Sequence, residues 1–160
     1  MAAMDIGLRA PHAQDFDFAR RLYFETMRSM IERLFGWNQA HQEESFIGWF
    51  KLDEVSIITA NGIDVGWIQC RSGRDEIFHG SIYVLPSMQR LGIGTHVLRS
   101  LLARAAHQSK VLTLAVMKLN PAVRLYERLG FRITHQDEYR LYMRADPQAG
   151  AVPECGPWVM

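Results

Sequence analysis

The chain has 160 residues, 48% of them apolar, and a formal net charge of +1 at pH 7. This length can bury one hydrophobic core but is too short for two domains of ordinary size. The absence of an interleaved basic and aromatic pattern argues against nucleic-acid binding, and no run of about 18 apolar residues predicts a membrane span. We therefore expect a single domain over residues 1–145 and a loosely ordered tail over residues 146–160.

Features that would indicate secretion or a metal site are missing from the sequence. The first five residues lack the basic and apolar segments of a signal peptide. The two cysteines, Cys70 and Cys155, are fewer than the disulfide framework of a small secreted domain would need. The six histidines show no metal-ligand spacing with Cys or carboxylates. We expect a cytoplasmic protein without a metal.

The first half of the chain predicts two helices and several strands. Apolar residues at three- and four-residue spacing predict a helix over residues 15–35, which Asp15 or Asp17 could cap, and a second helical pattern covers about residues 39–50. The dipeptide Asn61-Gly62 is a strong hairpin signal. The strands predicted in this half cover residues 6–10, 56–61, 63–71 and 76–85.

The second half alternates helices with strands. The pattern predicts a helix over residues 92–108, a largely apolar strand over 112–118 and a helix over 120–129. Pro121 in the first turn and Gly130 after the last turn fit the usual punctuation of a helix. Two closing strands, residues 131–136 and 139–144, are expected to form a hairpin.

The segment from Leu85 to Thr95 leads from a strand through a glycine loop into a helix. Glycines let backbone N–H groups approach an anion closely, and the positive end of the helix dipole points to the same place. The loop is not a dinucleotide-binding fingerprint, since Val97 occupies the position of the third glycine, and it lacks the Gly-Lys-Ser/Thr of a phosphate-binding P-loop. This pattern predicts a phosphate cradle.

Charge is unevenly distributed along the chain. Residues 77–126 contain six basic residues and no Asp or Glu, whereas the remainder contains 12 basic and 17 acidic residues. Carboxylates near a partly desolvated cleft would repel phosphate groups, so their exclusion suits a multiply charged anion. An ordinary amphipathic helix with solvated arginines would give a similar pattern.

Two motifs together resemble the GCN5-related N-acetyltransferases (GNAT), over roughly residues 5–144. They are Gln89-x-x-Gly92-x-Gly94 and Asn120-x-x-Val123-x-x-Tyr126-x-x-x-Gly130-Phe131. The resemblance implies an α/β (α+β) fold with a mixed central sheet of about six to seven strands and about four helices. It implies that the sheet splays between the strand ending at Leu85 and the strand starting at Leu112, and that acetyl-CoA is the cosubstrate.

The resemblance also implies roles for individual residues. Main-chain groups of Ile82 and Val84 would pair with pantetheine and the thioester, and Asn120 would contact the cofactor arm or simply cap its helix. Tyr126 would protonate the departing thiolate, although it could instead be a core aromatic. The amides expected to hold the pyrophosphate are those of Gln89, Arg90, Leu91, Gly92, Ile93, Gly94 and Thr95.

The general base is less well defined by the sequence. Glu76 and His79 are candidates because they lie on or before the strand expected to carry the thioester. Their side chains should point to opposite faces, so at most one can line the cleft, and either could be a surface residue while solvent removes the proton. Cys70 could be acylated in a ping-pong reaction, but a buried apolar role is the stronger expectation.

The acceptor side is expected to lie on the first two helices and their linker. The hypothesis favoured by the motifs is transfer of an acetyl group to a primary amine of a small molecule, by direct attack in a ternary complex. Alternatives are a sensor that binds acyl-CoA without catalysis, and an enzyme that modifies a protein N-terminus or lysine. We expect neither a nucleic acid nor a membrane as partner; a homodimer is left open.

Overall fold

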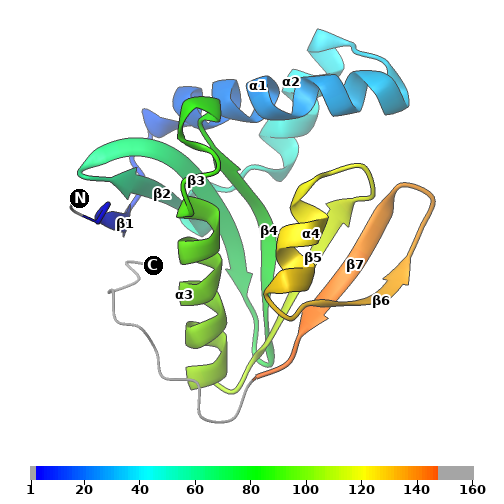
Figure 1. Cartoon of the computed structure of the whole chain (residues 1–160). Helices are drawn as coiled ribbons and strands as arrows, with labels where there is room; N and C mark the ends of the chain where they lie inside the picture. Colours follow the sequence, from blue (N-terminus) through cyan, green and yellow to red (C-terminus); the bar gives the residue numbers. More distant parts are fainter. Residues whose placement is uncertain (1–2, 148–160) are drawn as a thin grey trace.

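The computed structural model describes residues 3–147 and forms one sheet of seven strands in the order β1-β2-β3-β4-β5-β7-β6 (Figure 1). All neighbouring strands are antiparallel except β4 and β5, which are parallel. The elements are β1 (Ile6–Arg9), α1 (Asp15–Phe35), α2 (Gln39–Trp49), η1 (Leu52–Glu54), β2 (Val55–Ala60), β3 (Ile63–Ser72), β4 (Glu76–Val84), η2 (Pro86–Met88), α3 (Ile93–His107), β5 (Val111–Met117), α4 (Ala122–Arg128), β6 (Arg132–Gln136) and β7 (Arg140–Ala145).

Each face of the sheet carries its own apolar cluster. Ile58 and Ile68 point to the face covered by α3 and α4, whereas their neighbours Ile57 and Trp67 point to the face covered by α1 and α2. This follows from the two-residue period of a strand. The second cluster is rich in aromatic rings, and the Trp67 indole Nε1–H donates to the Ala19 carbonyl of α1 at 3.1 Å. The mixed α/β fold predicted from the motifs is confirmed.

The two central strands separate part of the way along their length. Pairing between β4 and β5 runs only from Glu76 and Val111 to His79 and Leu114. Beyond His79 the rest of β4 pairs with β3 alone, and β5 pairs with β7. The predicted splay is confirmed, and its apex lies at His79. Figure 1 shows α3 on one side of the opening and α4 on the other.

Several local expectations were wrong at the edges of elements. Two short 3₁₀ helices, η1 and η2, were not predicted. The helix expected over residues 120–129 is regular only from Ala122 to Arg128. Among residues 3–147 no helix is long and apolar enough to cross a membrane. Most of the predicted tail, residues 148–160, lies outside the part that the structure describes.

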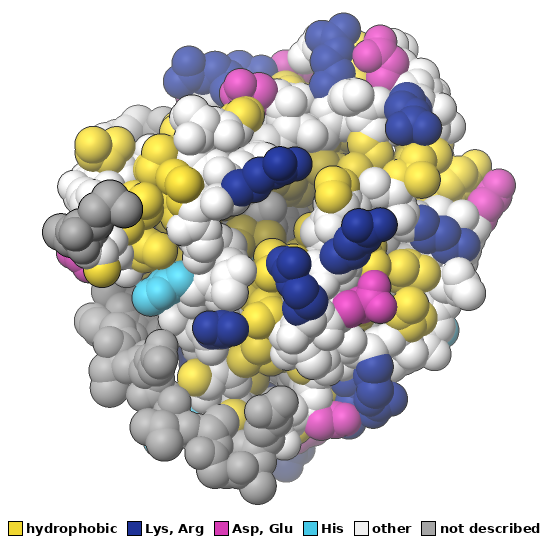
Figure 2. All heavy atoms as spheres, viewed as in Figure 1, with side chains coloured by type: hydrophobic (Ala, Val, Ile, Leu, Met, Phe, Trp, Pro, Cys, Tyr) yellow, Lys and Arg dark blue, Asp and Glu magenta, His cyan; other side chains and the backbone are white. Residues whose placement is uncertain are grey.

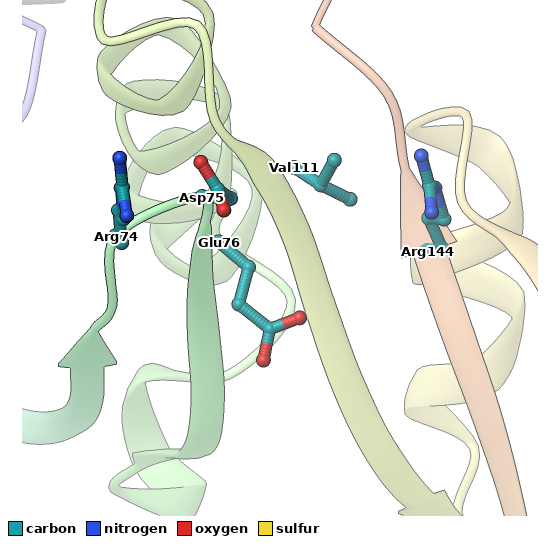
Figure 3. Close-up of a pocket in the computed structure, with 5 residues that line it drawn as sticks. All are labelled: Arg74, Asp75, Glu76, Val111 and Arg144. Carbon is teal, nitrogen blue, oxygen red and sulfur yellow. The ribbon is translucent and has the colours of Figure 1, made fainter.

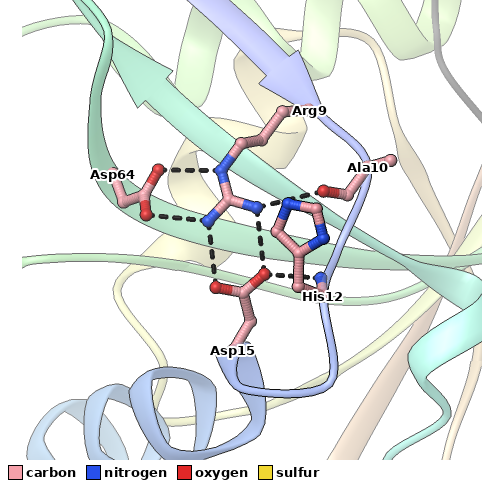
Figure 4. A network of polar contacts seen from close by, with 5 residues as sticks. All are labelled: Arg9, Ala10, His12, Asp15 and Asp64. Atoms are coloured by element: carbon pink, nitrogen blue, oxygen red, sulfur yellow. Dashed lines mark hydrogen bonds and ion pairs between the residues drawn. The ribbon is translucent and has the colours of Figure 1, made fainter.

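An ion-pair network joins the start of α1 to the sheet (Figure 4). The Arg9 guanidinium on β1 contacts the Asp15 carboxylate at 2.9 Å and the Asp64 carboxylate of β3 at 2.8 Å. Asp15 also accepts the His12 N–H at 2.7 Å, so the expectation that Asp15 or Asp17 caps α1 was wrong. The N-cap residue is Gln14, which makes no side-chain cap bond. Asp15 instead connects the start of α1 to β1 and to the loop that precedes the helix.

We expect Asp15→Ala to lower the free energy of unfolding by about 2 kcal/mol, because a buried carboxylate with charged partners is lost. The Arg9 side chain holds the pKa of Asp15 below its usual value. This stabilisation is therefore present above the unfolded-state pKa of 3.8 and disappears as the pH falls through the folded-state pKa. Urea denaturation at pH 7 and pH 3 measures both effects. Asp17→Ala, at an exposed position on the same helix, is the matched control and should change the free energy of unfolding by less than about 0.5 kcal/mol.

Candidate active site

The glycine loop presents a row of N–H groups at the start of α3. Gly92 has a φ of 84° and Arg90 a φ of 64°, so the chain turns through the left-handed region at both residues. Within residues 3–147, the N–H groups of residues 90–95 have no hydrogen-bond acceptor, and the first helical bond is that of His96 to Gly92 at 3.0 Å. Such a row at a helix N-terminus is suited to bind phosphate oxygens.

Gln89 differs from the other residues of this loop. Its own N–H donates to the Pro86 carbonyl at 3.3 Å, so that amide is already used within the turn. Its side-chain Nε2 donates to the Val84 carbonyl at 2.9 Å. The side chain of Gln89 therefore fastens the loop to the last residue of β4, which is a role that the motif did not reveal.

The face that carries the loop is rich in positive charge. Figure 2 shows Lys and Arg side chains around a hollow on this face, which Figure 1 places between α3 and α4. The exposed basic residues in the carboxylate-free segment include Arg90, Arg99, Lys118 and Arg124. Positive side chains around a hollow attract an anion and raise its local concentration.

One edge of β4 faces the splay. The Leu85 N–H donates to the Val65 carbonyl of β3 at 2.8 Å. Because main-chain groups alternate between the two edges of a strand, those of Ile82 and Val84 point away from β3 and into the opening. Their side chains are half-buried against the core that α3 and α4 cover. The Val84 carbonyl is occupied by Gln89, which leaves the Val84 N–H and both groups of Ile82 for a ligand.

Asn120 lies at the start of α4 and is half-buried. Its Oδ1 accepts the Ala122 N–H at 2.9 Å, so the side chain satisfies one of the unpaired donors at the helix N-terminus. The N-cap residue itself is Pro121, so Asn120 supports the start of the helix from one residue before the cap. A contact with the cofactor arm stays a prediction.

Three polar side chains form a buried chain at the apex of the splay. His79 Nε2 lies 3.2 Å from the Tyr126 hydroxyl, and His79 Nδ1 lies 3.9 Å from Cys70 Sγ. Their exposed fractions are 1% for His79, 5% for Tyr126 and 4% for Cys70. The sequence identified His79 and Tyr126 separately but did not predict that they meet. A register shift between Gln69 and Cys70 sets Cys70 opposite His79.

Burial sets the protonation of these three groups. It lowers the pKa of His79 to about 4, against a smaller opposing effect of a hydrogen bond to the Gln69 backbone. Burial raises the pKa of Cys70 to about 12 and the pKa of Tyr126 above its usual value. At neutral pH the chain therefore holds a neutral imidazole, a phenol and a thiol. A thiol of this kind is a poor nucleophile, which agrees with an apolar role for Cys70.

Glu76 is not brought together with His79 and Tyr126. It is exposed at the first residue of β4, at the end of the strand opposite the glycine loop. There it lines an open cavity of about 540 Å³ with Arg74, Asp75, Val111 and Arg144 (Figure 3). Figure 3 shows Val111 on β5 and Arg144 on β7 across from it. The geometry gives Glu76 no direct route to the apex.

Aromatic side chains dominate the opposite face of the sheet. Tyr23 makes edge contacts with Trp49 and with Tyr83 of β4, at ring-centroid distances of 5.2 and 5.4 Å. Phe35, at the last residue of α1, packs on Tyr139 of the β6–β7 turn at 4.7 Å. This last contact joins two segments about a hundred residues apart and was not predicted. In the described part of the chain no group of three or more His, Cys, Asp or Glu could hold a metal ion.

Comparison with known proteins agrees with this geometry. The structure is similar to PaiA N-acetyltransferase of Thermoplasma acidophilum in complex with coenzyme A, with a TM-score of 0.72, 15% identity, and coverage of 89% of this chain and 99% of that one. It is also similar to the ribosomal-protein-S18-alanine N-acetyltransferase of Escherichia coli, with a TM-score of 0.65, 21% identity, and coverage of 89% and 94%.

A third similar structure is yncA of Salmonella typhimurium with its cofactor acetyl-CoA, at a TM-score of 0.59, 21% identity, and coverage of 94% and 99%. At these identities the likeness concerns the fold alone. A search of curated protein sequences finds no match. The model of the acetyltransferase (GNAT) family matches residues 16–131, well over half of the sequence. The chain is therefore an acetyltransferase of the GNAT family.

Proposed function

We propose that this protein is a cytoplasmic enzyme that transfers the acetyl group of acetyl-CoA to a primary amine of a small molecule. The observation that carries the proposal is the splay between β4 and β5. It has acceptor-free N–H groups at its mouth and a buried phenol at its apex. Phosphates can therefore be held at one end while the thioester lies at the other.

The residues of the opening fit the parts of the cosubstrate in order. The amides of residues 90–95 face the pyrophosphate, and the surrounding Lys and Arg side chains offset its charge. The free edge of β4 offers the Ile82 main chain and the Val84 N–H to the pantetheine amides, as an added strand would use them. These roles are consistent with the family but rest on the geometry of this chain.

The chemistry is an attack by the amine on the thioester carbonyl within a ternary complex. A main-chain N–H on the free edge of β4, near Ile82, would stabilise the oxyanion that develops. Tyr126 gives its proton to the departing thiolate, and burial keeps the phenol protonated until then. Direct attack is favoured over a ping-pong route because burial keeps the Cys70 thiol protonated.

The contact between Phe35 and Tyr139 supports a small acceptor. Because α3 and α4 flank the side where the glycine loop would hold the cofactor, the amine has to approach from the side of α1 and α2. There the Phe35 ring packs on the Tyr139 ring at 4.7 Å and joins α1 to the β6–β7 turn. A bridge at this place narrows the room for a long polypeptide acceptor.

A protein N-terminus is the second candidate acceptor. The enzyme of Escherichia coli with a similar fold is named for a ribosomal-protein alanine, so the same architecture can serve a polypeptide. Phe35 has 51% of its surface exposed, so the contact that it makes with Tyr139 lies at the surface. An acceptor panel therefore has to include both chemical classes.

The first experiment is thermal denaturation with acetyl-CoA, CoA and ADP, followed by thiol release in the same samples with small amines and with short peptides carrying a free N-terminus. We expect acetyl-CoA and CoA at 100 times their dissociation constant to add about 2.7 kcal/mol to the stability of the folded state, and ADP to stabilise less. We also expect a small amine to release CoA.

Each result separates the hypotheses. Stabilisation by acetyl-CoA together with CoA release by a small amine supports the proposal. Release of CoA with peptides alone would show that the acceptor is a polypeptide and not a small molecule. Stabilisation with no release by any acceptor would support a sensor of acyl-CoA. Absence of any stabilisation would contradict the assignment of the splay as the cosubstrate site.

A further inference from the structure

In the buried chain of Cys70, His79 and Tyr126, the two nitrogens of the His79 ring face groups from different elements. Tyr126 approaches His79 Nε2 from α4, whereas Cys70 and Gln69 approach the other side of the ring from β3. A hydrogen bond to the Gln69 backbone favours the protonated ring. Since Nε2 faces Tyr126 and Nδ1 faces Cys70 of β3, the hydrogen that the proposal requires lies on Nδ1.

This tautomer determines whether the Tyr126 hydroxyl donates a hydrogen bond to His79 or accepts one from it. With its hydrogen on Nδ1, the neutral ring has a lone pair on Nε2 and accepts the Tyr126 O–H at 3.2 Å. The lone pairs of the Tyr126 oxygen are then not used by His79. A phenol held in this way is placed to accept a proton first and to donate one afterwards. Among the described residues, the charged groups that influence the Cys70 end of this chain are Arg104 of α3 and Glu54 of η1.

We propose that His79 is a positioning residue that acts through Tyr126 and briefly holds its proton, so that one buried pair serves both proton transfers of the reaction. This inference rests on the proposed acetyl transfer. It assigns no role to Glu76, which lies exposed at the far end of β4, and it explains how the amine can lose a proton without that carboxylate.

The reaction needs two proton transfers, one from the amine and one to the leaving sulfur, and the pair carries out both. As the amine nitrogen bonds to the thioester carbon, its N–H proton passes to the Tyr126 oxygen while the phenolic proton passes to His79 Nε2. When the carbon–sulfur bond breaks, the electron pair leaves with sulfur, Tyr126 gives a proton to it, and His79 returns its proton to Tyr126. The net result is an amide and a CoA thiol, with both side chains unchanged.

The first test needs no catalysis. In the ¹⁵N NMR spectrum of the wild-type protein labelled at histidine, we expect the His79 ring to carry hydrogen on Nδ1 and a bare, hydrogen-bonded Nε2 at pH 7. Hydrogen on Nε2 would overturn the proposal, whether or not an acceptor amine has been found. The spectrum of His79→Gln, which should lack only this ring, assigns the signal.

The second test is a kinetic cycle. The amide oxygen of His79→Gln can still accept the Tyr126 O–H but cannot take up its proton, so we expect kcat to fall about 100-fold with KM for acetyl-CoA within twofold. In the Tyr126→Phe background the same change should cost less than twofold, because His79 acts only through Tyr126. A loss below tenfold in the wild-type background, or losses that multiply in the double variant, would overturn the proposal. A total lack of transfer by the wild-type protein would instead count against the proposed function and leave the NMR test intact.

Discussion

Replacing Tyr126 by Phe is expected to lower kcat by about 100- to 1000-fold, which is the usual contribution of a positioned proton donor. The change removes only the hydroxyl group, and the ring can keep its edge contact with Phe131 at 5.6 Å. KM for acetyl-CoA should change little, because the amides of residues 90–95 and the free edge of β4 do not depend on this hydroxyl. Steady-state kinetics over pH 6–10 with the best amine of the panel measures both constants.

The matched control is Tyr142→Phe. Its hydroxyl donates to Asp137 in the β6–β7 turn at 3.0 Å and not to a residue at the apex. We expect kcat to stay within about twofold of the wild-type value. If Tyr126→Phe kept full activity at every pH, neither the acid role of Tyr126 nor the proton-holding role of His79 could stand.

The sequence predicted best what short-range physics controls. The helix over residues 15–35 was placed at its observed bounds because an apolar stripe at helical spacing fixes a buried face. The turn at Asn61-Gly62 formed as expected, with both residues at positive φ. The glycine loop also lies where the motif placed it, because Gly92 supplies a left-handed conformation at the helix start.

Interactions between segments far apart in the sequence could not be predicted from local residue patterns. Arg9 and its partner Asp64 are 55 residues apart in the sequence, and Phe35 and Tyr139, whose rings are in contact, are about a hundred residues apart. The 1% exposure of His79 and its contact with Tyr126 were not predicted, and neither was the local shift in the pairing of β3 and β4 that sets Cys70 opposite it. Such a shift moves side chains relative to their partners, and no residue pattern in one strand encodes it.

The burial of His79 should make the fold sensitive to mild acid. The unfolded chain binds a proton at this histidine near pH 6.5, whereas the folded protein binds it only near pH 4. Between these values the unfolded state holds more protons, so the free energy of unfolding falls as the pH falls. A shift of this size corresponds to about 3 kcal/mol. The stabilisation is fully present above pH 6.5 and is lost progressively down to about pH 4.

Urea denaturation at half-unit steps from pH 7.5 to pH 4 measures this slope in the wild-type protein and in His79→Gln. The variant should be less stable at pH 7.5 but should lose much less stability on acidification, because its amide does not titrate. His96→Gln is the matched control, since that ring is exposed on α3, and it should keep the wild-type slope. The Asp15 network begins to lose stabilisation only below about pH 5, and it is present in the wild-type protein and in both variants, so it does not affect the difference between their slopes. Equal slopes in the wild-type protein and His79→Gln would mean that His79 is hydrated in solution, and that the neutral ring required for proton transfer with Tyr126 is not enforced by burial.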